Sequence, residues 1–407
     1  MKRFETDLAE RLAKLREQNL FRELRLVESP QCPRIRIGGG TFLNFASNDY
    51  LGLANHPALK EAAARAVEIY GAGSGASRLI CGSLAPSHEL EAAMAKLKKT
   101  ESALAFSTGY AAAQGAITAL LGKEDVIVLD KLVHACIVDA AHLSGARIRV
   151  FRHNDLEDLE DKLKWAGKNA DPAQNCPPRV LIVTESIFSM DGDAAPLPEI
   201  VALKEKHGAW LMVDEAHATG IFGKNGGGLI EEFALTGRVE VQMATLGKAL
   251  GAAGGCICGS RQLVDFLMNR ARPFIFSTAP VPTAAAAATA AVSLVQSQEG
   301  EKLRQKLMSN IADFQSAFGE CRSSSPSSND RAGANRPSAI IPINLGDEQN
   351  ALDASSELRA QQIFVPAIRY PSVARGAARL RITLSAAHSR QDIFSLVEAL
   401  KTLDIVT

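Results

Sequence analysis

Three side chains in one stretch of this sequence could do chemistry together: Asp214, His217 and Lys248. Asp214 ends the short apolar run 209–213, a pattern typical of a buried parallel strand. Such a strand delivers its last residue to the carboxyl edge of the sheet, where open α/β sheets bind ligands. Lys248 lies further on, within the small and apolar residues 243–251. We therefore expect the three side chains to meet at one edge of a sheet.

Pyridoxal phosphate is the cofactor that best fits an acid, a histidine and a lysine at such an edge. Its aldehyde needs an amine, which Lys248 can supply, and its ring nitrogen needs a carboxylate, which Asp214 can supply. At about 3 Å and an effective dielectric of roughly 20, that ion pair is worth on the order of 5 kcal/mol before desolvation. Each residue also has an ordinary structural reading: Asp214 as a helix cap, Lys248 as a residue at a helix start, and His217 as a core histidine. All three together, in a strand-end context, favour the cofactor site.

Residues 214–220 (DEAHATG) and 245–251 (TLGKALG) resemble signatures of the α-oxoamine synthases, pyridoxal-phosphate enzymes that condense an amino acid with an acyl-CoA. The resemblance runs from about Leu43 to Leu400. It implies the aspartate-aminotransferase-like α/β fold (PLP fold type I), with a mostly parallel seven-stranded sheet in a large domain and a small C-terminal α/β domain. We expect an arm helix and strand in residues 1–45, the large cofactor-binding domain in 46–289 and the small domain in 290–407. The resemblance also implies a homodimer with a shared active site.

The resemblance assigns roles around the cofactor. Residues 107–110 read as a helix start, whose free N–H groups and dipole suit a phosphate, although a plain glycine turn is the structural alternative. His134 matches the histidine that stacks on the cofactor ring, and Thr278 lies in a segment that touches the phosphate of the partner subunit. The expected cofactor contacts are Gly109, Tyr110, His134, Ser189, Asp214, His217, Thr245, Lys248 and Thr278, of which His134, Asp214, His217 and Lys248 are expected to be catalytic.

Substrate contacts are expected at both ends of the chain. Arg379 and Arg381 alternate with apolar residues, so both should point to one face of a strand, and an arginine fork suits a carboxylate. Arg381 matches the family arginine that holds the carboxylate of the amino acid. The full expected set is Arg22, Asn48, His134, Ser372 and Arg381. From the residues alone, Arg22 reads as a solvated surface arginine, Asn48 as a turn former and Arg381 as a salt-bridge partner.

Composition excludes several classes of protein. The 407 residues carry 45 basic and 45 acidic side chains, which gives no support for a nucleic-acid or membrane-surface partner. The alanine-rich run 284–295 is too short to span a bilayer and predicts a buried helix.

Seven cysteines without paired spacing, and no signal-peptide core, favour a reducing cytoplasm. We expect no metal site, because no Cys or His cluster completes one. Residues 322–338, rich in Ser, Asn, Gly and Pro, predict a surface loop.

Two other classes remain as alternatives. Gly71, Gly73 and Ala76 match a dinucleotide fingerprint, but a helix rather than a strand precedes them, so an NAD dehydrogenase is a distant reading. A non-catalytic partner subunit is a second alternative, against which the presence of Lys248 argues.

Within the family, residues 367–369 and 378–388 most resemble the branch of biotin biosynthesis that joins L-alanine to a pimeloyl thioester. The sister activities glycine C-acetyltransferase, 5-aminolevulinate synthase and serine palmitoyltransferase stay open. Composition does not distinguish their acyl chains, nor an acyl-CoA donor from an acyl carrier protein.

Overall fold

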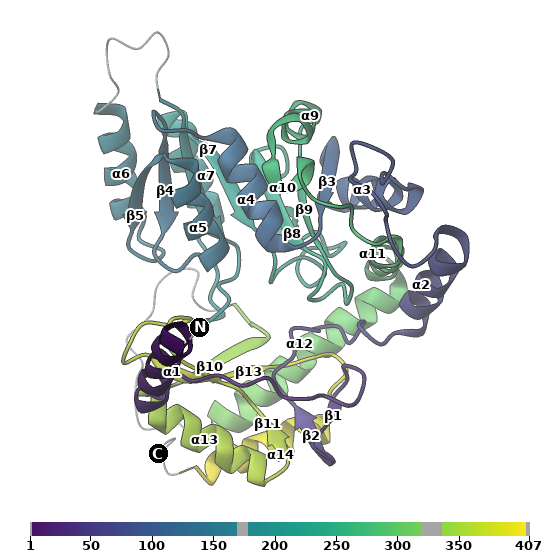
Figure 1. Cartoon of the computed structure of the whole chain (residues 1–407), viewed down its shortest axis with the longest axis vertical. Coiled ribbons are helices and arrows are strands. Elements are labelled where there is room, and N and C mark those ends of the chain that lie inside the picture. Colours follow the sequence, from purple (N-terminus) through teal and green to yellow (C-terminus); the bar gives the residue numbers. More distant parts are fainter. Residues whose placement is uncertain (1, 169–177, 320–335, 404–407) are drawn as a thin grey trace.

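A seven-stranded sheet forms the centre of the larger part of the molecule (Figure 1). The computed structural model describes residues 2–168, 178–319 and 336–403. The strand order is β3-β9-β8-β7-β6-β4-β5, and β9 alone runs antiparallel to its neighbours. This confirms the predicted mostly parallel sheet. Its strands are β3 (Ser102–Phe106), β4 (Val126–Asp130), β5 (Arg147–Phe151), β6 (Val180–Glu185), β7 (Trp210–Asp214), β8 (Val241–Thr245) and β9 (Gly255–Gly259).

Helices cover both faces of this sheet because its strands are apolar on both sides. In β4, Val126 and Val128 face one buried cluster, whereas Ile127 and Leu129 face the other. The first cluster includes residues of α3 (Ala85–Lys98), α6 (Leu156–Lys168), α7 (Leu197–His207) and α11 (Pro282–Val295). The second includes residues of α4 (Gly109–Leu120), α5 (Ala135–Ser144), α9 (Arg261–Arg270) and α10 (Arg272–Ile275). The remaining helices of this part are α2 (Pro57–Tyr70) and α8 (Leu229–Glu232).

Two small sheets lie below the large one in Figure 1. The antiparallel sheet β10-β13-β12 consists of β10 (Ile340–Gly346), β12 (Ala367–Ile368) and β13 (Ala378–Thr383). The other is formed by β1 (Arg34–Ile37), β2 (Gly40–Asn44) and β11 (Ile363–Phe364), and β2 pairs with β11 in parallel. Helices α12 (Gln298–Gly319), α13 (Glu348–Ala360) and α14 (Arg390–Lys401) accompany these sheets. The N-terminal strands therefore pair with a C-terminal strand.

The division into residues 1–45, 46–289 and 290–407 stays a proposal, and its second boundary would fall inside α11. The buried helix predicted at 284–295 is confirmed, since α11 packs against α2 and α3. Among the described residues, no helix combines the length and apolarity that crossing a membrane requires.

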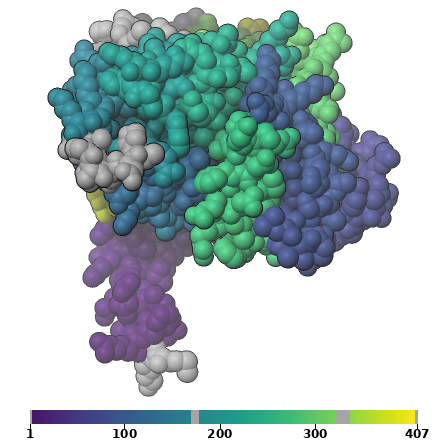
Figure 2. All heavy atoms as spheres, turned by 90° about the horizontal axis from the view of Figure 1, so that it is seen from above, coloured from purple at the N-terminus to yellow at the C-terminus, as the bar shows by residue number. Residues whose placement is uncertain are grey.

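The N-terminal helix α1 spans Lys2–Glu17. Figure 2 shows α1 projecting away from the body of the molecule. The apolar side chains Phe4, Leu8, Leu12 and Leu15 of this helix are exposed in the single chain. Most of the loop predicted at 322–338 lies outside the described residues.

Candidate active site

The carboxyl ends of three neighbouring strands bring the candidate residues together. Asp214 is the last residue of β7 and pairs in register with Glu185 of β6 and Met243 of β8. Lys248 follows β8 by three residues, and His217 follows β7 by three. The apolar strands thus place an acid, an imidazole and an amine at the edge where the sequence pattern predicted them.

Lys248 and His217 are in direct contact. The Nζ atom of Lys248 lies 2.7 Å from Nε2 of His217, and Nδ1 of His217 lies 2.6 Å from the hydroxyl of Tyr50. His217 and Tyr50 are buried, whereas Lys248 is partly buried. The imidazole is therefore held at both ring nitrogens in one orientation.

Burial controls the charges at this site. It lowers the pKa of the Lys248 amine, an effect that Asp214 and Glu185 partly oppose. It raises the pKa of Asp214, which the positive charge of Lys248 counters. Burial, reinforced by Lys248 and Arg381, also holds the pKa of His217 well below its usual value, so this ring is neutral. The site contains an amine that loses its proton easily and an acid that needs a cationic partner.

The start of α4 lies against the end of β8. Thr108 caps this helix, and its side chain accepts a hydrogen bond from the N–H of Ala111 at 3.0 Å. The first N–H groups of a helix, here those of Gly109 and Tyr110, have no intrahelical acceptor. A Cβ on Gly109 would lie 2.8 Å from the Thr245 hydroxyl, so this position has no room for a side chain. The predicted phosphate residues thus form a compact cradle of N–H and hydroxyl groups.

His134 caps α5 at the rim of the site. Its Nδ1 accepts a hydrogen bond from the N–H of Cys136 at 3.2 Å and lies 3.0 Å from the Cys136 thiol. Burial, and then the charge of Lys248, lower the pKa of His134, while Asp214 raises it. Because Nδ1 is an acceptor, the single proton of the neutral ring lies on Nε2.

Arg381 of β13 reaches the same site from the small sheet. Its Nε donates to the carbonyl of Ser189 at 2.6 Å, and NH1 donates to Oδ1 of Asn48 at 3.1 Å and to the Thr383 hydroxyl at 2.9 Å. Arg379, on the same face of β13, instead donates to Asp191 at 2.6 Å. Of the two arginines, Arg381 joins the residues predicted for substrate and cofactor, and Arg379 makes a structural ion pair.

Three predicted residues, Arg22, Ser372 and Thr278, are exposed in the single chain. Arg22 donates from NH2 to the carbonyl of Tyr370 at 2.8 Å, and Ser372 donates its N–H to the carbonyl of Arg369 at 3.0 Å. Ser372 therefore lies on the exposed loop after β12, and Arg22, from the segment after α1, contacts that loop. Thr278 is exposed and forms a bridge with Ser77. A role for Thr278 in the site of a partner subunit remains a proposal.

A buried ion pair fixes the segment that carries His217. The Nζ of Lys98 donates to Glu215 at 2.8 Å, to the Thr219 hydroxyl at 2.7 Å and to the carbonyl of Gly227 at 2.8 Å. The other Glu215 oxygen accepts the N–H of Ile230 at 3.0 Å. All three protons of the ammonium have acceptors, which is what keeps a buried charge tolerable.

The segment that carries Ser189 is held by a second charged cluster. His153 bridges two carboxylates, with Nδ1 at 2.9 Å from Asp130 and Nε2 at 2.7 Å from Asp193. Burial opposes a charge on this ring, but the hydrogen bonds to Asp130 and Asp193 outweigh it and raise the pKa of His153 to about 10. Gly192 lies in the chain between Ser189 and Asp193, and a Cβ on it would meet the carbonyl oxygen of Ile340 at 2.2 Å. The loop is therefore clamped against both sheets.

A pH-dependent contribution of His153 to stability follows. Because its pKa rises on folding from 6.5 to about 10, the stabilisation is complete below about pH 6.5 and is lost as the pH rises to about 10. The free energy of unfolding of His153→Gln should therefore approach that of the unsubstituted protein across this range. Denaturant unfolding at several pH values measures it, with His142→Gln on the exposed side of α5 as control. A difference that does not change with pH would contradict the charge assigned to His153.

The sequence patterns missed two buried site residues. Tyr50 lies two positions after Asn48, but a tyrosine in a turn gives no sign of a distant histidine. Glu185 ends the apolar strand β6 in the same way that Asp214 ends β7, so the strand-end pattern could have identified it. Burial and the neighbouring Asp214 raise the pKa of Glu185, and its Oε1 is buried without a hydrogen-bond partner in the described part of the chain.

The donor set fits pyridoxal phosphate. An amine of lowered pKa, a carboxylate 4% exposed that needs a cation, and a helix start lined by the Thr245 hydroxyl match its aldehyde, its ring nitrogen and its phosphate. Within residues 2–168, 178–319 and 336–403, no group of three or more His, Cys, Asp or Glu side chains is arranged to hold a metal ion.

Comparisons with known proteins identify the family of this chain. The family model for aminotransferase class I and II matches residues 41–400. The 8-amino-7-oxononanoate synthase of Geobacter sulfurreducens is 44% identical over 396 residues, which cover 97% of this chain and 96% of that protein. A serine palmitoyltransferase from S. paucimobilis with bound PLP superposes with a TM-score of 0.87 at 29% identity, covering 99% of this chain and 97% of that one. The 8-amino-7-oxononanoate synthase of Francisella tularensis has a TM-score of 0.73 at 27% identity, with coverages of 88% and 96%.

Proposed function

The chain belongs to the aminotransferase class I and II family, in its α-oxoamine synthase branch, and we propose that it catalyses the reaction of 8-amino-7-oxononanoate synthases. L-Alanine and a pimeloyl thioester combine to give 8-amino-7-oxononanoate, carbon dioxide and the free thiol. One observation carries the proposal: the Nζ of Lys248 lies 2.7 Å from Nε2 of His217 and is acted on by the charge of Asp214, so a reactive amine and an acid share one site. The proposed enzyme acts in the cytoplasm as a homodimer, with Thr278 reaching the partner's site.

Bound pyridoxal phosphate supplies an aldehyde for the amine of a substrate and a ring that withdraws electrons from its α-carbon. Asp214 keeps the ring nitrogen protonated, since a buried carboxylate is stabilised by a cation beside it. Gly109, Tyr110 and Thr245 hold the phosphate. His217 and Ser189 are assigned to the phenolic oxygen, and His134 to the face of the ring.

The protein's own groups then position the amino acid and move its proton. Arg381, fixed by Ser189 and Asn48, holds the carboxylate of alanine. The Nζ of Lys248 removes the α-proton, for which its lowered pKa suits it, since a base must be uncharged at the working pH. Arg22, which donates to the carbonyl of Tyr370, is assigned to the acyl donor, and Ser372, on the exposed loop after Tyr370, to the amino acid.

Serine palmitoyltransferase activity is the second candidate, because the structure of a serine palmitoyltransferase superposes over nearly the whole chain. The identity of 29% to that protein, against 44% to an 8-amino-7-oxononanoate synthase, favours the first candidate.

A matched set of assays separates the two candidates. The purified enzyme is given alanine, glycine or serine with pimeloyl-, acetyl-, succinyl- or palmitoyl-CoA, and release of the free thiol is measured. We expect alanine with pimeloyl-CoA to give a kcat/KM at least about 100-fold above every other pair, a preference worth about 2.7 kcal/mol. A preference for serine with palmitoyl-CoA would establish the second candidate, and one for glycine would defeat both.

A further inference from the structure

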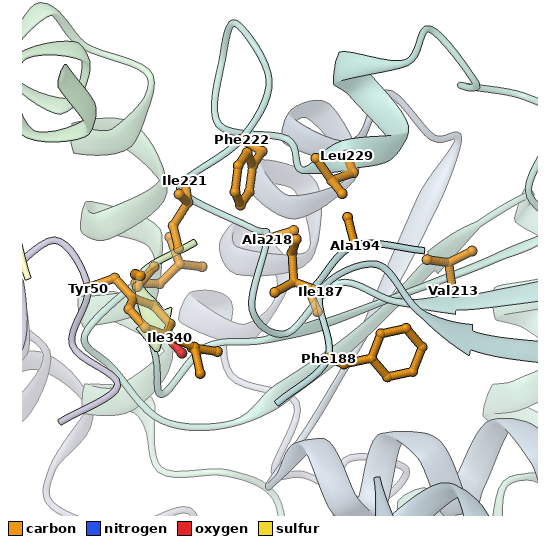
Figure 3. Close-up of a cluster of buried hydrophobic side chains, with 14 of the residues drawn as sticks. Tyr50, Ile187, Phe188, Ala194, Val213, Ala218, Ile221, Phe222, Leu229 and Ile340 are labelled. Carbon is orange, nitrogen blue, oxygen red and sulfur yellow. The ribbon is translucent and has the colours of Figure 1, made fainter. Parts of the chain in front are cut away.

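The hydroxyl of Tyr50 contacts His217, the partner of Lys248, yet the reaction described above gives Tyr50 no part. Tyr50 is fully buried, and Figure 3 shows it in a cluster of hydrophobic side chains that also includes Ile221 and Ile340. Its oxygen lies 2.6 Å from Nδ1 of His217 and 3.3 Å from Oδ1 of Asn48. A hydroxyl in such surroundings must give its proton to one of these acceptors.

Arg381 helps to determine which of the two acceptors receives the proton of the Tyr50 hydroxyl. Arg381 donates from NH1 to Oδ1 of Asn48 at 3.1 Å, so this oxygen already has a strong donor. The positive charge of the same guanidinium also acts on the Tyr50 hydroxyl and lowers its pKa. Burial raises the pKa of Tyr50 to about 12 despite this positive neighbour, so the hydroxyl keeps its proton at neutral pH. The proton is left to point at His217, which is also the nearer acceptor.

We propose that Tyr50 is a positioning residue that fixes the tautomer of His217: its hydroxyl donates to Nδ1, and Nε2–H therefore points at the amine of Lys248. A neutral imidazole has a single N–H. If Nδ1 accepts a hydrogen bond, the proton of the ring must therefore be on Nε2. That proton lies on the 2.7 Å line to Nζ of Lys248. To accept it, the amine must offer its lone pair, which is the form that reacts with an aldehyde or removes a proton.

The opposite tautomer would have the opposite effect. If Nδ1 donated to Tyr50, Nε2 would accept a proton from Lys248 and favour the charged ammonium. The neighbouring charges do not decide between these states by themselves, because acids and bases both face the pair. The groups that act on Lys248 are Asp214, Glu185, Arg381 and Cys136, and those that act on His217 are Lys248, Arg381 and His134.

The tautomer can be read directly from the full-length protein freed of cofactor. The chain has eight histidines, so ¹⁵N-histidine labelling gives a small set of ring signals, and His217→Asn identifies those of His217. Long-range ¹H–¹⁵N spectra report which ring nitrogen carries the proton. We expect the Nε2–H form in the unsubstituted protein and a mixture of both forms in Tyr50→Phe. Tyr70→Phe, at the end of α2, is the matched control. An Nδ1–H form in the unsubstituted protein overturns the proposal without any variant.

A second readout follows the amine. The rate at which the cofactor-free protein captures pyridoxal phosphate is measured against pH, and its midpoint gives the apparent pKa of Lys248. We expect Tyr50→Phe to raise this midpoint by about one unit, or about tenfold slower capture near neutral pH, with thermal melting unchanged. An unchanged midpoint overturns the proposal.

The catalytic consequence of this inference rests on the proposed function, but neither readout uses an acyl donor. If the enzyme preferred another amino acid or another acyl donor, the proposed function would be wrong, but the tautomer result would still stand.

Discussion

Lys248→Ala is expected to lower kcat by at least about 10⁴-fold, because it removes both the covalent attachment point of the cofactor and the base. The purified variant should lose the visible absorption of the lysine-bound cofactor. The substitution also leaves Nε2 of His217 without its 2.7 Å partner. Activity with alanine and pimeloyl-CoA, together with the absorption spectrum, measures both effects.

A second buried lysine controls for loss of a cation. Lys204→Ala removes a side chain that is 8% exposed and pairs with Glu240, away from the carboxyl edge of the sheet. This variant should keep the cofactor spectrum and most of its activity. If both variants kept their spectra, or if both lost them, Lys248 would have no special part.

Asp214→Asn is expected to lower kcat by roughly 10³-fold, since an ion pair worth on the order of 5 kcal/mol holds the ring nitrogen protonated. The amide oxygen can still accept the N–H of Ala216, which Asp214 accepts at 2.9 Å. Because burial raises the pKa of Asp214, the neutral amide also removes a desolvation cost. We therefore expect the cofactor-free variant to melt at the same temperature as the unsubstituted protein or above it.

An analogue of the cofactor with a methylated, permanently cationic ring nitrogen tests the cause. It should restore a large part of the activity of Asp214→Asn, since the carboxylate would no longer be needed to retain a proton. Loss of activity accompanied by a lower melting temperature, and not restored by the analogue, would instead point to a damaged fold.

Strand-end chemistry explains why the core of the site was predictable. A short apolar run must be buried, and the charge that ends it must emerge at the edge of the sheet, which locates Asp214 from sequence alone. The alternation in β13 likewise places Arg379 and Arg381 on one face. It does not reveal which of the two reaches the site, because that depends on Ser189 and Asn48 from distant segments.

Long-range pairing was beyond the sequence patterns. The parallel pairing of β2 with β11 joins residues more than 300 positions apart, and no local period encodes it. The same limit hid the contact of Tyr50 with His217, 167 positions away. The exposed apolar stripe of α1 illustrates a related limit, because periodicity predicts an apolar face without identifying the surface that covers it.

The covalent position of the cofactor tests the account most directly. Borohydride reduction of the intact enzyme, followed by proteolysis and mass spectrometry, locates the pyridoxyl group on the chain. We expect one label per chain, on the peptide that contains Lys248. A label on any other lysine, or none on an enzyme that still condenses alanine with pimeloyl-CoA, would contradict the assignment of the amine next to His217.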